Sequence, residues 1–405
     1  MIDFSLSDEE RAVRDTIRQF IQQEVMPLED QVLRNERGGL PPLEPGQLAE
    51  LQRKAKAGGW WGINTPEQYG GIALGPVMSA IVAMETGRTF VPFRFGGSAD
   101  NILYAGTDEQ KQQYLIPTIN GERRSCFAIT EPGAGSDARN IRTRAVKDGA
   151  DWVINGEKTW NTGVHTASHD LIFARTSGTP GSGEGITAFL VPVDAAGFTV
   201  KEYLWTFNMP TDHAHVSLTG VRVPDTAILG GEGRGLAVVQ HFFNENRIRQ
   251  AASSLGAAQF CIDRSVEYAK TRAPFGKPLA SNQAIQFPLV ELQTQCEMLR
   301  ALIHKTAWGM DQYGPLSQSD KVSMCNFVAN RLCCDAADRA MQVHGGLGYS
   351  RHQPFEHIYR HHRRYRITEG AEEIQMRRVA GYMFGYMKQQ APKGVPGTFA
   401  DPSGA

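Results

Sequence analysis

A glycine-rich segment in the first half of the chain carries residue types that bind phosphate. The run Phe127–Asp137 ends a short apolar stretch with a G-x-G-x-x-A pattern that starts at Gly133, close to the dinucleotide-binding fingerprint. Exposed backbone N–H groups in such a turn can hold an anion, and the hydroxyls of Thr130 and Ser136 add donors. From these residues alone, an ordinary loop rich in turn residues is an equally good interpretation.

The sequence after this segment argues against a dinucleotide-binding fold, which needs a helix after the glycines. Residues 141–147 instead alternate between apolar and polar, and Asp148-Gly149 and Asn155-Gly156 follow. Asp-Gly and Asn-Gly between short apolar strands are hairpin signals. We therefore expect the glycines to open an antiparallel sheet.

The hydrophobic period changes twice along the chain. Helical spacing begins with a capping box at Ser7, gives way to a period of two near residue 121, and returns near residue 233. The expected fold is α+β and multidomain: an N-terminal all-α domain (1–120), a middle β-barrel or sandwich domain (121–232) and a C-terminal four-helix bundle (233–390). The tail 391–405, which contains Pro, Gly and Ser, is expected to be disordered.

Element bounds follow from the same periodicity. We expect helices over residues 7–36, 45–58, 76–90, 108–119, 235–272, 283–312, 317–344 and 353–389. We expect strands over residues 125–130, 142–147, 152–158, 171–175, 186–193, 198–203, 213–223 and 227–229.

Composition excludes several classes of protein. The chain has 405 residues, is 41% hydrophobic and 21% charged, and carries a net charge of −1, which favours neither nucleic acid nor anionic membrane as a partner. No apolar run is long enough to span a bilayer, and the N-terminus does not resemble a signal peptide. The six scattered cysteines form no Cys-x-x-Cys pair. We expect a reduced, cytoplasmic setting and no metal site.

Several polar or aromatic residues have a structural interpretation as well as a chemical one. Trp160 fits a core aromatic, and Arg272 fits a cation at a helix C-terminus. Glu369 fits an acid at the start of a helix that begins near Ala371. The basic run Arg360–Arg364 fits a solvated helix face or an interface strip.

Four separated blocks of sequence favour the chemical interpretation of these residues over the structural one. In their order and spacing they resemble the acyl-CoA dehydrogenase family of flavoproteins, and the resemblance extends over roughly residues 5–388. The blocks are Phe127–Asp137; Trp152–Gly163; Arg272–Leu279 with Gln283 and Gln286; and Gln342–Tyr349 with Arg366–Gly370.

The resemblance implies FAD bound without a dinucleotide-binding fold, between the β domain and the C-terminal helices. It implies that the backbone of Phe127, Ile129 and Thr130, with the Thr130 hydroxyl, faces the pyrimidine edge of the flavin. Ser136 is then expected at the pyrophosphate. Trp160 is expected against the flavin ring, and Thr162 is expected near N5.

The resemblance also implies that a neighbouring subunit completes the cofactor site. The residues expected to do so are Arg272, Phe275, Gln283, Gln342, Gly345 and Gly346. Arg272 suits a pyrophosphate because guanidinium pairs with phosphate in a bidentate way. Ala371 and Glu373 depart from residues common in the family near the FAD adenosine.

The implied reaction is oxidation of an acyl-CoA to the 2,3-enoyl thioester. A carboxylate takes the α proton, and the β hydrogen leaves as hydride to flavin N5. The resemblance assigns the base to Glu369, because the alternative position used by some members is Asn246 here. A dry site would raise the carboxyl pKa toward working pH. Arg247 and Ser136 are expected to contact the substrate.

By this resemblance the chain is expected to be an FAD-dependent acyl-CoA dehydrogenase of fatty acid metabolism. It is expected to be a homodimer or homotetramer and to pass electrons to an electron-transfer flavoprotein. The alternatives are an acyl-CoA oxidase or flavin monooxygenase on the same fold, or a non-catalytic FAD-binding partner subunit. The presence of Glu369 favours the dehydrogenase.

Overall fold

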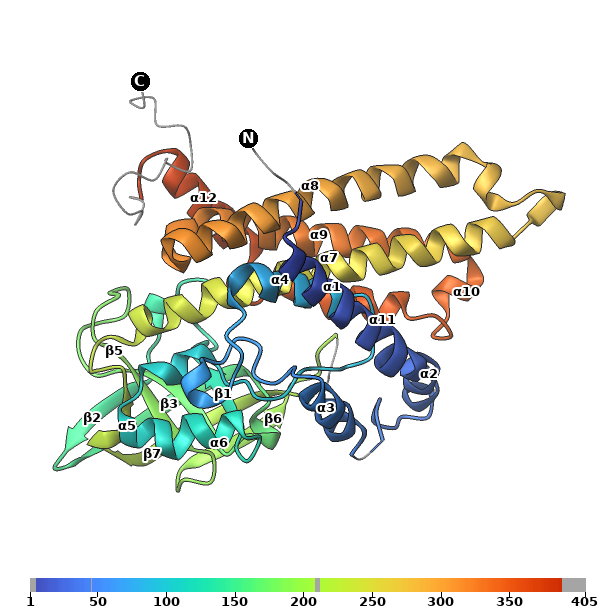
Figure 1. The fold of residues 1–405 in the computed structure, drawn as a ribbon. Coiled ribbons are helices and arrows are strands. Elements are labelled where there is room, and N and C mark those ends of the chain that lie inside the picture. The colour runs from blue at the N-terminus through green and yellow to red at the C-terminus, as the bar shows by residue number, and fades with distance from the viewer. Residues whose placement is uncertain (1–4, 45, 208–211, 388–405) are drawn as a thin grey trace. The chain divides into compact units, whose positions relative to one another are not determined.

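The computed structural model describes residues 5–44, 46–207 and 212–387, which form two compact units (Figure 1). Of the described residues, the helical unit combines those within 5–64, 72–95 and 244–387, and the β unit combines those within 65–71 and 96–243. The N-terminal and C-terminal helices expected as separate domains thus share one unit. Residues 391–405, expected to be disordered, lie outside the described residues.

The helical unit is built from long amphipathic helices joined by short turns. Its helices are α1 (Asp8–Phe20), α2 (Glu29–Arg37), α3 (Gln47–Ala57), α4 (Gly75–Thr86), α8 (Gln283–Tyr313), α9 (Ser319–His344), α10 (Gly346–Tyr349), α11 (Phe355–Arg363) and α12 (Glu372–Met383). Helix α7 (Gly235–Thr271) begins in the β unit and continues into the helical unit. Single turns are η1 (Ile21–Val25), η2 (Met26–Leu28), η9 (Pro274–Gly276), η10 (Leu279–Ser281), η11 (Pro315–Gln318) and η12 (Arg364–Arg366).

The ends of these helices follow local sequence signals. The capping box at Ser7 is present, since its hydroxyl accepts from the Glu10 N–H at 3.1 Å and the Glu10 carboxylate accepts from the Ser7 N–H at 2.7 Å. The expected helix over 353–389 is interrupted between η12 and α12. Glu369 and Gly370 lie in this interruption, and both have positive φ.

Close backbone contact joins α4 to α7 in the core of the helical unit. A Cβ atom on Gly87 would lie 2.2 Å from the Ser253 carbonyl oxygen, and one on Gly256 would lie 2.1 Å from that of Met84. Only glycine fits at either position. The crossing therefore fixes where α7 lies against the N-terminal helices. Arg247 lies on the same helix, before the crossing.

The β unit is a sheet of all eight expected strands, in the order β6-β7-β3-β2-β4-β5-β8 with β1 paired to β4. The strands are β1 (Ser125–Ala128), β2 (Arg144–Asp148), β3 (Asp151–Thr162), β4 (His169–Arg175), β5 (Ile186–Pro192), β6 (Phe198–Tyr203), β7 (His213–Pro224) and β8 (Ile228–Leu229). The short helical segments of this unit are η3 (Glu67–Tyr69), η4 (Asn101–Ala105), α5 (Asp108–Gln110), η5 (Lys111–Leu115), α6 (Ile116–Ile119), η6 (Ala138–Asn140), η7 (Val164–Thr166) and η8 (Asp225–Ala227).

The hairpin expected at Asp148-Gly149 is confirmed, whereas Asn155-Gly156 makes no turn because it lies inside β3. After Ala138 the chain makes one turn, η6, and then enters β2, which pairs antiparallel with β3 through Asp148 opposite Asp151. Between β1 and β2 the described chain contains this single 3-10 turn and no α-helix. The glycine-rich segment is therefore not part of a dinucleotide-binding fold.

Strands β4 and β5 are buried on both faces, so alternate residues contribute to two different cores. Ile172 and Ala174 pack in the core of the sheet, whereas Leu171 and Phe173 pack with Leu115 and other residues of the covering helices. Residues 96–120, expected with the N-terminal domain, therefore belong to the β unit.

The basic run Arg360–Arg364 is not a solvated face along its whole length. His362 is 6% exposed, because α11 packs against α9. Its Nδ1 lies 2.8 Å from the Ser254 hydroxyl, and that hydroxyl donates to the Asn330 side-chain oxygen at 2.7 Å. The interpretation as a solvated face is thus wrong for this histidine.

This burial predicts acid sensitivity. Burial, assisted by Arg364 and His357, lowers the pKa of His362 to about 3, below the 6.5 of an exposed imidazole. The stabilisation is complete above pH 6.5 and is lost as pH falls toward 3, because the unfolded chain binds the proton first. We expect the temperature midpoint of unfolding to decrease as the pH is lowered from 7 to 4.5. We expect the decrease to be smaller in the His362→Asn variant. His352→Asn, at an exposed histidine, is the control; an equal fall in all three proteins would contradict the assignment.

Candidate active site

A bulge in β3 turns Trp160 away from the core. Ile154 and Lys158 face inward, and simple alternation would send Trp160 inward as well. The register with β7 shifts between Lys158 and Asn161, and Trp160 adopts φ +59°. As a result Trp160 is 56% exposed and Asn161 is buried. Trp160 and Thr162 therefore share the exposed face of the strand.

The loop after β1 lies beside this bulge. The Thr159 N–H donates to the Thr130 carbonyl at 3.0 Å. Gly133 and Gly135 are exposed, and the nearest atom to an added Cβ is Thr130 Cγ2, 4.0 Å from that of Gly135. Packing within this chain does not require glycine at either position. The open backbone, with exposed Ser136 beyond it, suits close approach by a phosphate.

Phe127 and Ile129 belong to the core of the β unit. The Phe127 ring lies 5.0 Å from Phe173 and 5.3 Å from Phe242, measured between centroids. Ile129 is 9% exposed. These side chains are engaged in packing, and the binding of flavin by their backbone groups stays a prediction of the resemblance.

The hydroxyl of Thr162 has a neighbour that the sequence did not indicate. Thr162 pairs with His213 across the β3–β7 ladder, and its Oγ1 lies 2.7 Å from the His213 Nδ1. This contact orients the hydroxyl on the same exposed face as Trp160.

A second set of predicted residues gathers at one end of the helical unit. Tyr268 and His344 stack with ring centroids 4.2 Å apart, so the ends of α7 and α9 lie side by side (Figure 1). Six exposed residues occur at these ends and in the turns that follow: Arg272, Phe275, Gln283, Gln342, Gly345 and Gly346. No atom approaches within 4 Å of a Cβ added to either glycine. The set is open to a ligand or a second chain.

Glu369 sits in a tight turn held from two sides. The Arg247 guanidinium donates through Nε, at 2.9 Å, and through Nη2 to the Glu369 carbonyl oxygen. Gln375 Nε2 donates to the next carbonyl, Gly370, at 2.9 Å. A Cβ on Gly370, which has φ +91°, would lie 3.0 Å from Arg247 Nη2. The turn therefore requires glycine there both for its conformation and for its space.

Two arginines each form a bidentate contact, called a fork below, with the Glu372 carboxylate that follows this turn. Arg331 donates to Glu372 through Nε and Nη2 at 3.0 Å each, and Arg366 donates through the same atoms at 2.9 Å each. These bonds lower the pKa of Glu372 to about 2. These bidentate contacts tie the start of α12 to α9 through Arg331 and to η12, on the other side of the turn, through Arg366.

Backbone strain coincides with the predicted chemistry. Four non-glycine residues of the described chain have positive φ, and three of them are the predicted site residues Trp160, Phe275 and Glu369; the fourth is Ala73. Each such residue costs of order 1–3 kcal/mol and persists only where its surroundings hold it. Strain at these positions is consistent with a functional role.

The structure gives Arg247 a role that the sequence did not indicate. Arg247 is 5% exposed, and burial lowers its pKa to about 10. Its donors support the backbone of Glu369, and its expected contact with the substrate stays a prediction. Neighbouring Asn246 is also buried and accepts from Arg249. Sequence reasoning likewise missed Glu372, whose partner Arg331 lies 41 residues away along the chain.

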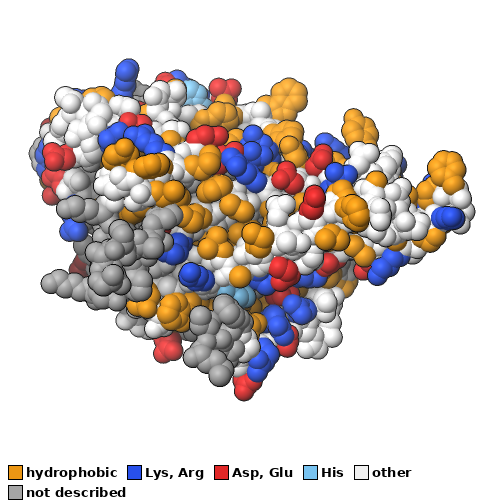
Figure 2. All heavy atoms as spheres, turned by 90° about the horizontal axis from the view of Figure 1, so that it is seen from above, with side chains coloured by type: hydrophobic (Ala, Val, Ile, Leu, Met, Phe, Trp, Pro, Cys, Tyr) orange, Lys and Arg blue, Asp and Glu red, His pale blue; other side chains and the backbone are white. Residues whose placement is uncertain are grey.

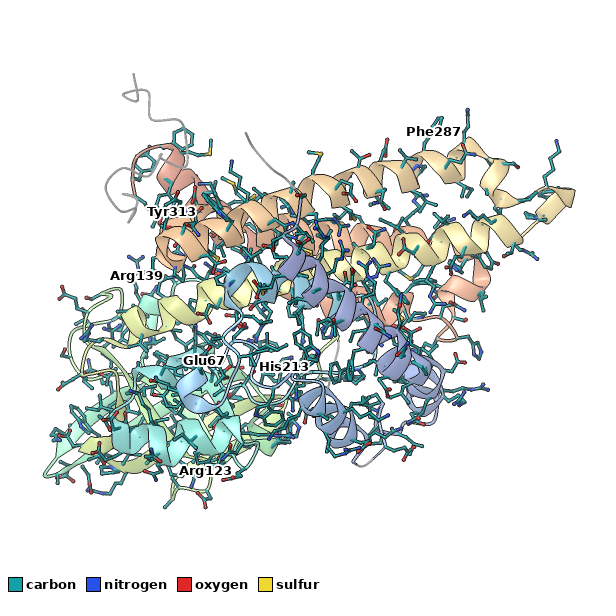
Figure 3. All side chains as sticks on the ribbon, viewed as in Figure 1. Glu67, Arg123, Arg139, His213, Phe287 and Tyr313 are labelled. Carbon is teal, nitrogen blue, oxygen red and sulfur yellow. The ribbon has the colours of Figure 1, made fainter. Side chains whose placement is uncertain are left out.

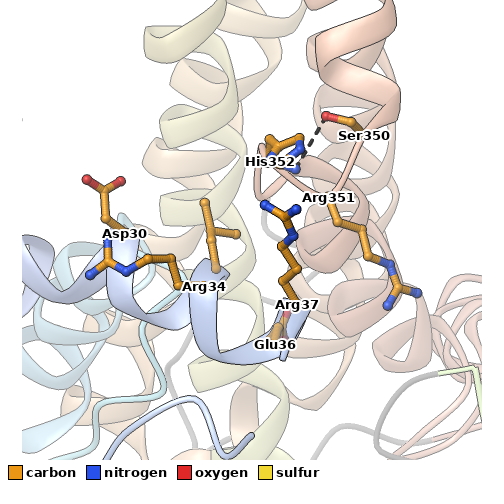
Figure 4. A pocket seen from close by; sticks show the side chains of 8 residues that line it. Asp30, Arg34, Glu36, Arg37, Ser350, Arg351 and His352 are labelled. Carbon is orange, nitrogen blue, oxygen red and sulfur yellow. Dashed lines mark hydrogen bonds between the residues drawn. The ribbon is translucent and has the colours of Figure 1, made fainter. Parts of the chain in front are cut away.

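One cavity of about 490 Å³ lies elsewhere in the helical unit (Figure 4). It lies between α2 residues such as Arg34 and Arg37 and the segment Ser350–His352. It includes none of the predicted site residues. In the described ranges, no cluster of side chains suits a metal ion, and no helix is long and apolar enough to cross a membrane.

Comparison with known proteins covers nearly the whole chain. Three family models match it: "Acyl-CoA dehydrogenase, N-terminal domain" at residues 7–122, "Acyl-CoA dehydrogenase, middle domain" at 126–221 and "Acyl-CoA dehydrogenase, C-terminal domain" at 233–384. The "Probable acyl-CoA dehydrogenase FadE2" of Mycobacterium tuberculosis is 33% identical over 94% of this chain and 96% of its own length.

Two further relatives show the same extent of similarity. The mitochondrial short-chain specific acyl-CoA dehydrogenase of Bos taurus is 33% identical over 93% of this chain and 90% of its own. The solved structure of butyryl-CoA dehydrogenase from Megasphaera elsdenii superposes with a TM-score of 0.80 at 27% identity, covering 95% of this chain and 100% of that one.

The arginine forks predict that Glu372 stabilises the turn at Glu369. Glu372→Gln leaves two arginines around a neutral group, and we expect a loss of about 1–3 kcal/mol in urea unfolding. Hydrogen exchange over residues 364–372 should become faster. Glu373→Gln, at the exposed neighbouring acid, is the matched control. Equal stability and equal exchange in the two variants would show that the forks do not hold the turn.

Proposed function

Because the chain belongs to the acyl-CoA dehydrogenase family, we propose that it desaturates an acyl-CoA thioester between Cα and Cβ, with Glu369 as the base. The observation that carries this proposal is the strained turn at Glu369, which Arg247 and Gln375 hold through adjacent carbonyl oxygens. Proton abstraction needs a carboxylate that projects from a backbone of fixed conformation, because geometry decides whether a base reaches the proton.

The residues of the β unit fit FAD. Gly133 and Gly135 leave exposed backbone for a pyrophosphate, with Ser136 beside them. Trp160 and Thr162 present an aromatic face and a hydroxyl on one side of β3. When bound there, FAD would supply the acceptor for the β hydrogen. The role of the protein is to orient that acceptor and the substrate and to move the α proton to the Glu369 carboxylate.

Asn246 narrows the choice of base. An amide cannot take up a proton usefully, so the helix position at residue 246 does not compete with Glu369. A carboxyl side chain at residue 369 also favours α-proton abstraction over the monooxygenase and non-catalytic alternatives. An electron-transfer flavoprotein is the electron acceptor we expect, with the protein acting in the cytoplasm.

Assembly into a homodimer or homotetramer is part of the proposal. Helix α8 exposes an apolar stripe at helical spacing, formed by Phe287 (56% exposed), Val290 (61%), Met298 (69%) and Trp308 (51%). Phe287 points outward from α8 in Figure 3, and Figure 2 shows hydrophobic side chains among the charges on the face seen from above. Such a stripe is suited to bury against a second copy. The exposed residues around Arg272 would then complete the FAD site of that copy.

The base assignment predicts the effect of Glu369→Gln. The amide keeps the shape of the side chain but cannot accept the proton, so turnover should fall by about 10²–10⁴-fold. Anaerobic bleaching of the flavin by a good acyl-CoA substrate measures this. FAD content and thermal midpoint should stay unchanged, since the backbone contacts of residue 369 remain. Glu369→Gln with Asn246→Glu should recover part of the rate. A single variant that bleaches as fast as the parent would refute the assignment.

The shared site predicts that flavin and assembly are lost together. Met298→Glu places a charge in the α8 stripe, and Arg272→Ala removes the expected phosphate contact. We expect the first variant to dissociate and release FAD, and the second to hold FAD more weakly and to lower oligomer stability. Analytical ultracentrifugation with flavin absorbance follows both quantities. A Met298→Glu monomer with full flavin occupancy would rule out a shared site.

A further inference from the structure

A buried ion pair lies directly behind the two segments proposed to face the flavin. Lys158 is 0% exposed and Glu131 is 7% exposed, and Lys158 Nζ lies 2.8 Å from Glu131 Oε1. Lys158 precedes Trp160 by two residues on β3, and Glu131 directly follows Thr130 in the loop. The pair therefore joins the loop to the strand from the inner side.

Lys158 also contacts the backbone of the loop. Its Nζ donates to the Ile129 carbonyl oxygen at 3.2 Å. The Ile129 carbonyl and the Thr130 N–H belong to one peptide group. A cation that bonds the carbonyl polarises that group and makes its N–H a stronger donor, as in any chain of hydrogen bonds inside a protein.

The Glu131 carboxylate has further partners besides Lys158. The Glu131 carboxylate also accepts from the Arg142 N–H at 2.6 Å and the Thr143 N–H at 2.9 Å. Burial alone would raise the pKa of Glu131, but Lys158 and these donors lower it overall. Burial pushes the pKa of Lys158 down, and Glu131 opposes that shift. The carboxylate thus accepts from two backbone N–H groups and from Lys158. Lys158 is the cation that contacts it, and an opposite charge at this distance favours the ionised carboxylate.

The burial of Lys158 and Glu131 is not explained by a gain in folding stability. Taking two ions out of water costs several kcal/mol each, and apolar residues of similar volume often serve as well. The same sheet places another lysine–glutamate pair, Lys201 with Glu157, at its surface, where both side chains are more than 40% exposed. The buried position of Lys158 is what gives it access to the Ile129 carbonyl.

We propose that Lys158 is a positioning residue that polarises the Ile129–Thr130 peptide toward the pyrimidine edge of FAD. The inference rests on the proposed FAD site. Reduction adds negative charge to the pyrimidine side of the flavin, so a stronger Thr130 N–H donor favours the reduced cofactor more than the oxidised one. Lys158 therefore tightens FAD binding and raises its reduction potential.

The experiment removes both charges together, so that neither is left buried and unpaired. Lys158→Met/Glu131→Gln keeps an acceptor for the Arg142 and Thr143 N–H groups. The matched control is Lys201→Met/Glu157→Gln on the same sheet. FAD affinity is measured by titrating apoprotein with FAD, and the midpoint potential by equilibration with a reference dye. Thermal unfolding checks that each variant is folded.

We expect the buried double variant to bind oxidised FAD about tenfold more weakly, the equivalent of about 1.4 kcal/mol. Its midpoint potential should fall, because the affinity for reduced FAD should decrease more than the affinity for oxidised FAD. Each tenfold difference between these two decreases corresponds to about 30 mV. The surface control should change neither quantity. If the buried double variant does not fold, Lys158→Gln/Glu131→Gln, which retains a neutral donor, is measured in its place with the same expectation.

The outcomes separate the two proposals. A parent protein that binds no FAD would refute the proposed function. A parent that binds FAD, with a folded buried variant of unchanged affinity and potential, would overturn only the role of Lys158. Weaker binding with an unchanged potential would also overturn it, because a purely structural effect on the loop weakens both oxidation states equally.

Discussion

The two hydrogen bonds from Arg247 to the carbonyl oxygen of Glu369 are the contact on which the geometry of the candidate catalytic turn depends. A buried guanidinium needs acceptors, and a left-handed turn needs donors that hold it. Each meets the requirement of the other. Because Gly370 leaves the space that Arg247 occupies, the turn, α7 and α12 are fixed by a single arrangement. The forks on Glu372 extend this arrangement to α9.

In the β unit, too, buried polar groups bond to one another beside a backbone of unusual conformation, here a strand bulge rather than a turn. The bulge that turns Trp160 outward also turns Asn161 inward, where its amide donates to buried Asp170. Burial raises the pKa of that carboxyl to about 6. Lys158, two residues before Trp160, pairs with Glu131. Polar groups that enter the core are thus bonded to one another, and the exposed face keeps a ring and a hydroxyl for a ligand.

Much of the fold could be predicted from the sequence because its signals are local. The capping box at Ser7, the Asp-Gly turn of the β2–β3 hairpin and the change of hydrophobic period each act within a few residues. These signals predicted all eight strands and the long helices. The exposure of Arg272 and Phe275 is consistent with the roles that the family resemblance implies for them.

The sequence by itself therefore determined the order and type of the elements, the family and the identity of the candidate base. Only the tertiary structure decided that Trp160 faces outward, since alternation along β3 predicts the opposite and the register with β7 produces the bulge. Only packing decided that Arg247 and His362 are buried. The same holds for Arg331 and Glu372, which are 41 residues apart in the chain and meet because α9 and α12 pack together. Periodicity reports a residue's neighbours along its own element, whereas burial and ion pairing depend on residues brought from other elements.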